Sequence, residues 1–205
     1  MIRTKEKLAQ YLEKIGKKPT EDNVLFLSYF LKAADAFIKN DPRTDNEFFS
    51  VTLLEQLLPI IGKIQDPTYN KFLVVSGQYG SGKTSIFKIM QTLTRGKKSF
   101  HRTRDSLEIA IGYEDDGRAY VQNLLNGRLC INDYGNTNQH ANHFRDSIKF
   151  IDEIVYLRWE AKGMATWFTT NIPSKGEFIE TFEERVQQRM RNRIDFLQLT
   201  GKNYR

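Results

Sequence analysis

Cysteine is almost absent from the sequence. The single Cys130 excludes an intrachain disulfide framework and suits a reducing compartment. Its place inside an apolar run favours a buried core residue over a nucleophile. Long hydrophobic runs are also lacking, because no uninterrupted apolar stretch approaches the roughly 20 residues of a membrane span. The first residues lack the apolar centre of a signal peptide, so we expect a cytoplasmic protein with no membrane partner.

Acidic residues are outnumbered by basic ones. The 205 residues include 31 Lys and Arg against 25 Asp and Glu, a formal net charge of +6. A basic excess favours a polyanionic partner, nucleic acid first, although a solvated basic face is the simpler alternative. One cluster consists of Arg95, Lys97, Lys98, His101, Arg102 and Arg104, and another of Arg185, Arg189, Arg191, Arg193, Lys202 and Arg205.

One stretch carries a chemical pattern. Residues 77–84 read GQYGSGKT, which matches the phosphate-binding pattern G-x-x-x-x-G-K-[ST] at every fixed position. The apolar run 71–76 before it is typical of a buried parallel strand, and 85–90 after it places apolar residues at helical spacing. A strand, a glycine-rich loop and a helix are the context in which this pattern binds phosphate rather than forming a chance turn.

The residue types of this loop indicate its chemistry. Glycines let the backbone curl so that N–H groups point at phosphate oxygens, and the following helix N-terminus adds partial positive charge. Lys83 can reach the β- and γ-phosphates, and Thr84 can hold Mg²⁺. We therefore expect ATP and Mg²⁺ as cofactors. The nucleotide-binding residues that we expect are Gly77, Gln78, Tyr79, Gly80, Ser81, Gly82, Lys83, Thr84 and Ser85.

The rest of the pattern predicts the fold class. Residues 1–65 are helical in pattern and carry no chemical motif, and 66–205 alternate strands with helices. This alternation predicts an α/β domain with a parallel five-stranded sheet covered by helices, preceded by an N-terminal helical segment. We expect strands at 71–76, 99–103, 128–133, 164–170 and 194–199. We expect helices at 5–15, 20–39, 46–64, 85–93, within 107–126, and at 143–162 and 177–192.

Polar residues end two of the predicted strands. Asn132 and Asp133 close the strand at 128–133, and Asn171 follows the strand at 164–170. Ligand sites in parallel sheets lie at the carboxyl ends of the strands, so we expect these side chains beside the phosphate-binding loop. With Thr84, the oxygens of Asn132 and Asp133 are the metal ligands that we expect.

This combination resembles the AAA+ P-loop ATPases. Within them it is most similar to the bacterial replicative helicase-loader (DnaC-like) family and to the related transposition ATPase IstB. The resemblance covers about residues 71–205. Its four parts are 77–84 as Walker A, 129–135 as Walker B, 168–171 as the sensor-1 strand end, and 184–191 with 201–205 as the C-terminal helix and terminal Arg motif.

The resemblance implies roles for individual residues. Asp133 would orient the attacking water, Asn171 would sense the γ-phosphate, and Arg189 would act as an arginine finger on a neighbouring subunit. Arg205 would contact the nucleotide as a terminal sensor-2-type Arg. Asn132 departs from the family, which usually has a Mg²⁺-coordinating Asp there, so hydrolysis could be slow or Asp133 could take the metal role. The chain ends without a separate lid domain, which we therefore do not expect.

The resemblance also implies a function. It suggests an ATP-hydrolysing DNA-replication protein that forms homo-oligomers on single-stranded DNA or on a replicative helicase, in a bacterial or phage-infected cell. Alternatives are a superfamily 3-type viral helicase and an IstB-like transposition ATPase. A weakly hydrolysing nucleotide-dependent binding module remains open because of Asn132. A small-molecule kinase shares the loop but gives no role to Asn171 or Arg189.

Overall fold

Five parallel strands form the centre of the computed structural model, which describes residues 5–14, 21–39, 51–97, 100–116, 118–135, 141–162 and 165–200. The strands are β1 (Phe72–Gly77), β2 (His101–Asp105), β3 (Arg128–Tyr134), β4 (Thr166–Thr170) and β5 (Ile194–Leu199). Their order in the sheet is β2-β3-β4-β1-β5, and every neighbouring pair is parallel. The predicted five-stranded parallel sheet is confirmed, and β4 separates β1 from β3.

The described residues also form nine helices. Those before β2 are α1 (Lys5–Lys14), α2 (Glu21–Lys39), α3 (Val51–Gln65) and α4 (Lys83–Thr94). Those after it are α5 (Ser106–Asp116), α6 (Arg118–Leu124), α7 (Ala141–Lys162), α8 (Lys175–Glu180) and α9 (Glu184–Met190). Residues 46–50 of the predicted third helix lie outside the described residues.

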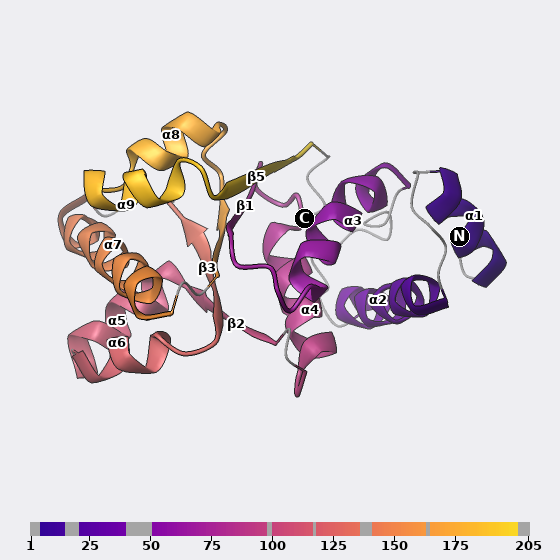
Figure 1. Ribbon diagram of the computed structural model, residues 1–205, viewed down its shortest axis with the longest axis horizontal. Helices are drawn as coiled ribbons and strands as arrows, with labels where there is room; N and C mark the ends of the chain where they lie inside the picture. Colours follow the sequence, from indigo (N-terminus) through magenta and orange to yellow (C-terminus); the bar gives the residue numbers. More distant parts are fainter. Residues whose placement is uncertain are drawn as a thin grey trace.

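Helices cover both faces of the sheet. Figure 1 shows α5 to α9 on one side and α3 and α4 on the other, with α2 and α1 beyond them. All six β1 residues are buried, and their side chains alternate between the two faces. Phe72 and Val74 join the core under α5–α9, whereas Leu73 and Val75 join the core under α2–α4. A strand buried on both faces explains the continuous apolar run in the sequence.

The N-terminal helices share core with the sheet. Phe30 of α2 and Leu57, Ile60 and Ile64 of α3 belong to the same buried cluster as Leu73. A smaller cluster of Leu12, Val24 and Leu27 joins α1 to α2. The domain boundary near residue 65 remains a prediction. Among the described residues, no helix is long and apolar enough to cross a membrane.

Two element predictions were wrong in detail. The single helix predicted at 177–192 is two helices, α8 and α9, separated by residues 181–183. Ser174 caps α8: its Oγ accepts a hydrogen bond from the Glu177 N–H and donates to Glu177 Oε1. Strand β2 begins at His101 and runs on to Asp105, two residues beyond the predicted end.

Candidate nucleotide-binding site

The loop between β1 and α4 depends on its glycines. Gly80 has φ 75° and Gly82 has φ 88°, a left-handed conformation that only glycine adopts cheaply. Gly77 is crowded instead: a Cβ there would lie 2.8 Å from the Leu199 carbonyl oxygen and 2.9 Å from Ser81 Oγ. Glycine is therefore required at these positions by the backbone conformation and close packing of the loop.

Ser81 is buried at the centre of this loop. Its side chain is 1% exposed, and its Oγ has no hydrogen-bond partner among the described residues. A buried hydroxyl without a partner costs free energy unless a ligand or water satisfies it. The orphaned hydroxyl thus fits a loop built to hold an anion such as a phosphate group.

Lys83 projects back into the loop. Its side chain is 5% exposed, and Nζ donates to the carbonyl oxygens of Gly77 at 2.7 Å and Gln78 at 2.8 Å. It also donates to Asn171 Oδ1 at 2.8 Å. The amide of Asn171 comes from the end of β4, next to β1 in the sheet. The structure therefore brings together Lys83 and Asn171, two residues that the sequence assigns to the phosphate site.

Asn132 on β3 lies at the centre of a hydrogen-bond network. Its side chain is 2% exposed, and its Oδ1 accepts hydrogen bonds from Thr84 Oγ1 at 2.7 Å and Thr169 Oγ1 at 2.6 Å. Its Nδ2 donates to Asp105 Oδ1 at 2.6 Å and Asp133 Oδ2 at 3.1 Å. Ionised carboxylates only accept, so the amide orientation follows from the network. The predicted metal ligands Thr84, Asn132 and Asp133 are thus linked.

Asp133 has an unusual backbone conformation. Its φ is 54°, and the pairing of β3 with β4 is irregular between Ile131 and Tyr134. The Asp133 N–H donates to Thr169 Oγ1 at 3.0 Å, which holds the irregular turn. Asp tolerates the left-handed region better than most residues, and such strain concentrates at functional sites.

The sequence pattern predicted no role for two residues of this network, Asp105 and Thr169. Asp105 was assigned to no role because the predicted strand ended at Thr103. The register of β2 on β3 places Asp105 opposite Asn132. The available signal was a carboxylate between the predicted strand at 99–103 and the helix predicted within 107–126.

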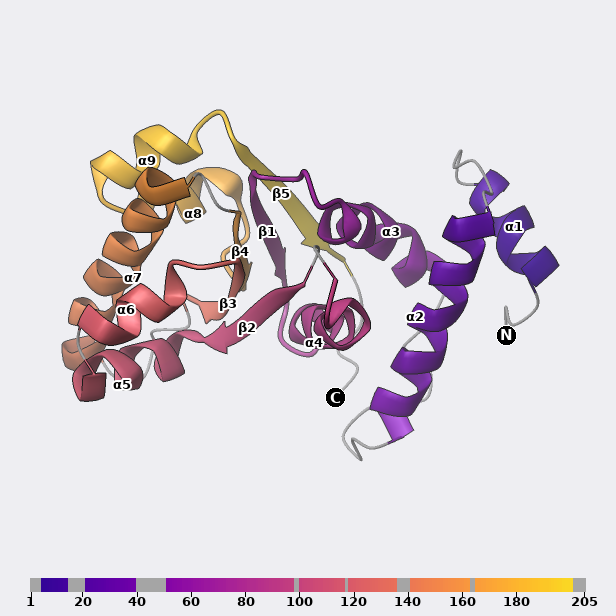
Figure 2. The same ribbon diagram turned by 60° about the horizontal axis from the view of Figure 1, so that its bottom comes forward.

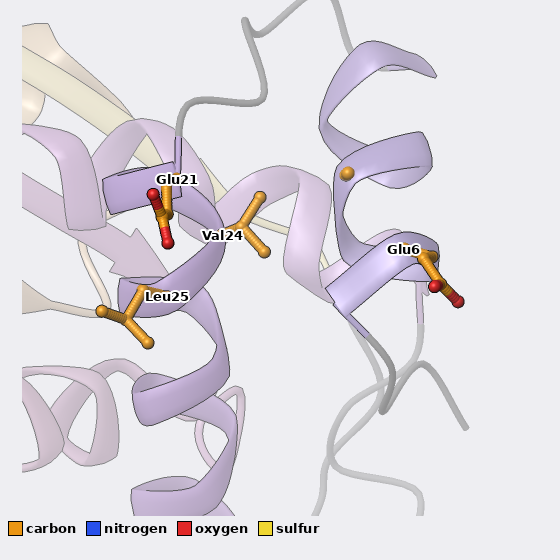
Figure 3. Close-up of a pocket in the computed structure, with 5 residues that line it drawn as sticks. Glu6, Glu21, Val24 and Leu25 are labelled. Carbon is orange, nitrogen blue, oxygen red and sulfur yellow. The ribbon is translucent and has the colours of Figure 1, made fainter.

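A hollow adjoins the loop at the carboxyl ends of β1, β4 and β5. Its volume is about 300 Å³, and its lining includes Gly77, Gln78, Asn171 and Gln198. A second hollow, of about 270 Å³ between α1 and α2, is lined by Glu6, Ala9, Glu21, Val24 and Leu25. Figure 3 shows Val24 directed toward α1, whereas Glu6 projects away from α2. Its two carboxylates and lack of any cation among these lining residues make it unsuited to phosphate.

Arg189 lies away from the loop. It sits on α9, which leads into the start of β5, whereas the loop follows the end of β1; Figure 2 shows the two at opposite ends of the sheet. Its Nε and Nη2 donate to Glu160 Oε1 at 3.0 and 2.6 Å, and the guanidinium lies 4.5 Å from the Tyr156 ring centroid. Arg205 lies outside the described residues.

The first basic cluster is smaller than predicted. His101 is fully buried beside Phe87 and Trp167, and desolvation lowers its pKa to about 4, so it is neutral at pH 7. Assigning His101 to a nucleic-acid surface was therefore wrong. Arg102 donates through Nη2 to the carbonyl oxygens of Asn123 and Asn126, at 2.6 and 2.7 Å. Arg95, Lys97 and Arg104 are exposed.

Comparisons with known proteins identify the fold. No protein-family model and no curated protein match the sequence. Among solved structures, a candidate primosome component from Streptococcus pyogenes serotype M3 matches with a TM-score of 0.53 and 18% identity, over 73% of this chain and 82% of that one. DnaI matches with a TM-score of 0.52 and 14% identity, over 82% of this chain and 89% of that one.

The replication initiator DnaA, solved with AMPPCP and single-stranded DNA, matches with a TM-score of 0.54 at 11% identity. That match covers 80% of this chain and 52% of the DnaA chain. The fold is that of an AAA+ P-loop ATPase. The predicted fold class is therefore confirmed, as is the resemblance to the AAA+ replication ATPases at the level of the fold. Residues 77–84, predicted as the Walker A loop, join β1 to α4, and residues 129–134 of the predicted Walker B segment lie on β3.

Proposed function

We propose that this protein is a nucleotide-switched DNA-replication ATPase of the helicase-loader type. The proposal is carried by one observation: Walker A residues Lys83 and Thr84 are hydrogen-bonded to polar side chains from the ends of two other strands, Asn171 and Asn132. A glycine-rich turn without a nucleotide function would not need these partners. The resemblance in fold to DnaI and DnaA supports the replication setting.

Each side chain of the site would have its own role. The Lys83 ammonium, now held by main-chain carbonyls and Asn171, would neutralise phosphate charge. Thr84 and Asn132 would hold Mg²⁺ with Asp133, and the ion would supply further charge neutralisation at the phosphates. Asp133 would orient the attacking water and accept its proton. Asn171 would contact the γ-phosphate from the end of β4.

Assembly would complete the site. Arg189 is at the amino end of the sheet and cannot serve the Walker A loop of its own chain without a large rearrangement. An arginine supplied to a neighbouring subunit would make hydrolysis depend on oligomer formation. The exposed cations Arg95, Lys97 and Arg104 would contact the phosphates of single-stranded DNA.

The test is the ATPase rate measured against protein concentration, with and without single-stranded DNA. We expect the rate per chain to rise with concentration, and DNA to lower the concentration required. The same titration with Lys83→Ala gives the background. A concentration-independent rate would contradict trans activation by Arg189. Rapid turnover with duplex unwinding would favour a self-sufficient helicase, and tight ATP binding without turnover would favour a binding module.

A further inference from the structure

Asp105 approaches the Walker B position from the neighbouring strand. It is the last residue of β2, and the parallel register pairs it with Asn132 on β3. Its Oδ1 accepts a hydrogen bond from Asn132 Nδ2 at 2.6 Å. Asp133 Oδ2 accepts from the same nitrogen at 3.1 Å. One amide group is therefore held between two carboxylates from two different strands.

These two carboxylates determine how Asn132 faces Thr84. Because they only accept, they fix the amide nitrogen on their side and turn Oδ1 toward the two threonine hydroxyls. The Thr84 hydroxyl proton is then committed to Asn132, which leaves the oxygen lone pairs of Thr84 available to a cation. An amide rotated by 180° would place its oxygen against the two carboxylates, so both of those contacts would be acceptor against acceptor.

The charge of the network also supports a role for Asp105 at the Mg²⁺ site. Mg²⁺ prefers anionic oxygen ligands, and an amide oxygen is neutral. The Asp105 carboxylate adds a negative charge that is hydrogen-bonded to Asn132, the residue that lacks a charge. We propose that Asp105 is the positioning residue of the Mg²⁺–nucleotide site: it fixes the Asn132 amide and supplies the carboxylate charge that Asn132 does not carry. This inference rests on the proposed nucleotide function of the Walker A loop.

A structural role for Asp105 is the competing explanation. Asp105 directly precedes α5, and its N–H donates to Glu108 Oε2 at 3.3 Å, as in half of a capping box. Asn caps helices as well as Asp does. Asp105→Asn therefore keeps a capping side chain and an acceptor for Asn132 Nδ2, and removes only the charge. A role limited to capping predicts no change in metal dependence for this variant.

The experiment measures binding rather than turnover. The β,γ-methylene analogue of ATP is titrated by calorimetry into each protein over a range of Mg²⁺ concentrations. The variants are Asp105→Asn, Asn132→Asp and the double variant that exchanges the two residues. Asp115→Asn, which removes an exposed carboxylate of α5, is the matched control. Thermal unfolding without metal confirms that each variant folds.

We expect Asp105→Asn to raise the half-saturating Mg²⁺ concentration about 10-fold, as loss of an outer partner does in metal sites. The double variant should return to within about threefold of wild type, because it restores one amide against one carboxylate across the two strands. Asn132→Asp alone should lower Tm without metal, since it places three carboxylates together, and Mg²⁺ should reverse this loss. Asp115→Asn should match wild type.

Two results would overturn the inference. One is a wild-type Mg²⁺ dependence in Asp105→Asn, and the other is a double variant that binds no better than Asp105→Asn. If Asp105→Asn does not fold, the Tm of the double variant without metal is compared with that of Asn132→Asp. The inference then requires the double variant to have the higher Tm, because the exchange removes one of the three carboxylates. Failure of wild type to bind the analogue at any Mg²⁺ concentration would instead refute the proposed function.

Discussion

At the scale of single residues, Asp133 combines a chemical role with a backbone constraint. Its φ of 54° lies in the region that Asp and Asn tolerate better than most other side chains. A substitution at this position therefore tests chemistry cleanly only if the new residue accepts the same backbone. Asn meets that condition and Ala does not.

At saturating Mg²⁺, Asp133→Asn should leave ATP binding within about threefold of wild type and lower the hydrolysis rate on the order of 100-fold, because a general base is lost while the backbone is kept. Steady-state ATPase assays paired with calorimetry measure both quantities. Asp133→Ala is the comparison, and it should also lower Tm. Unchanged turnover in Asp133→Asn would remove Asp133 from the catalytic role.

The residues that the sequence could predict are those tied to a local pattern. Lys83 and Thr84 follow from the loop motif, and Asn132 and Asn171 from the rule that polar residues gather at carboxyl ends of parallel strands. Asp105 could not be placed in this way, because its role depends on the register of β2 against β3. His101 was misplaced because a basic run in sequence does not reveal which side chains face the core.

At the scale of elements, the break between α8 and α9 has a tertiary cause. Apolar residues continue across it at helical spacing, and neither Gly nor Pro marks it, so the sequence alone predicts one helix. Phe182 in the break is buried and stacks on Tyr134 with ring centroids 4.9 Å apart. Asp152 Oδ2 of α7 accepts a hydrogen bond from the Glu183 N–H at 2.6 Å. Contacts with β3 and α7 thus start a new helix.

Asp152 makes stability depend on pH. Desolvation raises its pKa to about 6, the Glu183 N–H opposes the rise, and its Oδ1 has no partner among the described residues. Because the pKa of the folded state lies above that of the unfolded state, this carboxyl stabilises the protein below about pH 4 and loses that contribution as pH rises through 6.

Asp152→Asn should therefore raise the free energy of unfolding by about 1–2 kcal/mol at pH 8, because it removes a buried charge yet keeps an acceptor for Glu183 N–H. Near pH 4 the gain should vanish. Thermal unfolding at both pH values measures the difference, and Glu153→Gln on the exposed side of α7 is the control. A gain of equal size at the two pH values would show that the charge of Asp152 is not its cause.

At the scale of the whole molecule, the Walker A loop and Arg189 lie at opposite ends of one sheet. Such a subunit can offer its loop to one neighbour and its arginine to another. Within the chain, Arg189 is held by Glu160 and Tyr156, contacts of a partly exposed pair that contribute little to stability. Losing this side chain should therefore affect hydrolysis more than folding.

Arg189→Ala should bind ATP normally and hydrolyse it poorly. Mixing it with Lys83→Ala should restore part of the activity, because each variant supplies what the other lacks across a shared interface. Arg191→Ala, which removes an exposed charge of the same type just after α9, is the control and should keep wild-type activity. If the two inactive variants stay inactive together while wild type assembles, Arg189 has no trans-acting role.

The central claim is that the loop from Gly77 to Thr84 binds a nucleoside triphosphate, and ATP titration by calorimetry with Mg²⁺ tests it most directly. Wild type should bind. Lys83→Ala should bind on the order of 100-fold more weakly, because charge-assisted hydrogen bonds to the phosphates are lost. Lys88→Ala, which removes an exposed cation from the same helix, should bind like wild type. Equal affinity of folded Lys83→Ala and wild type, or no binding by wild type, would contradict the account.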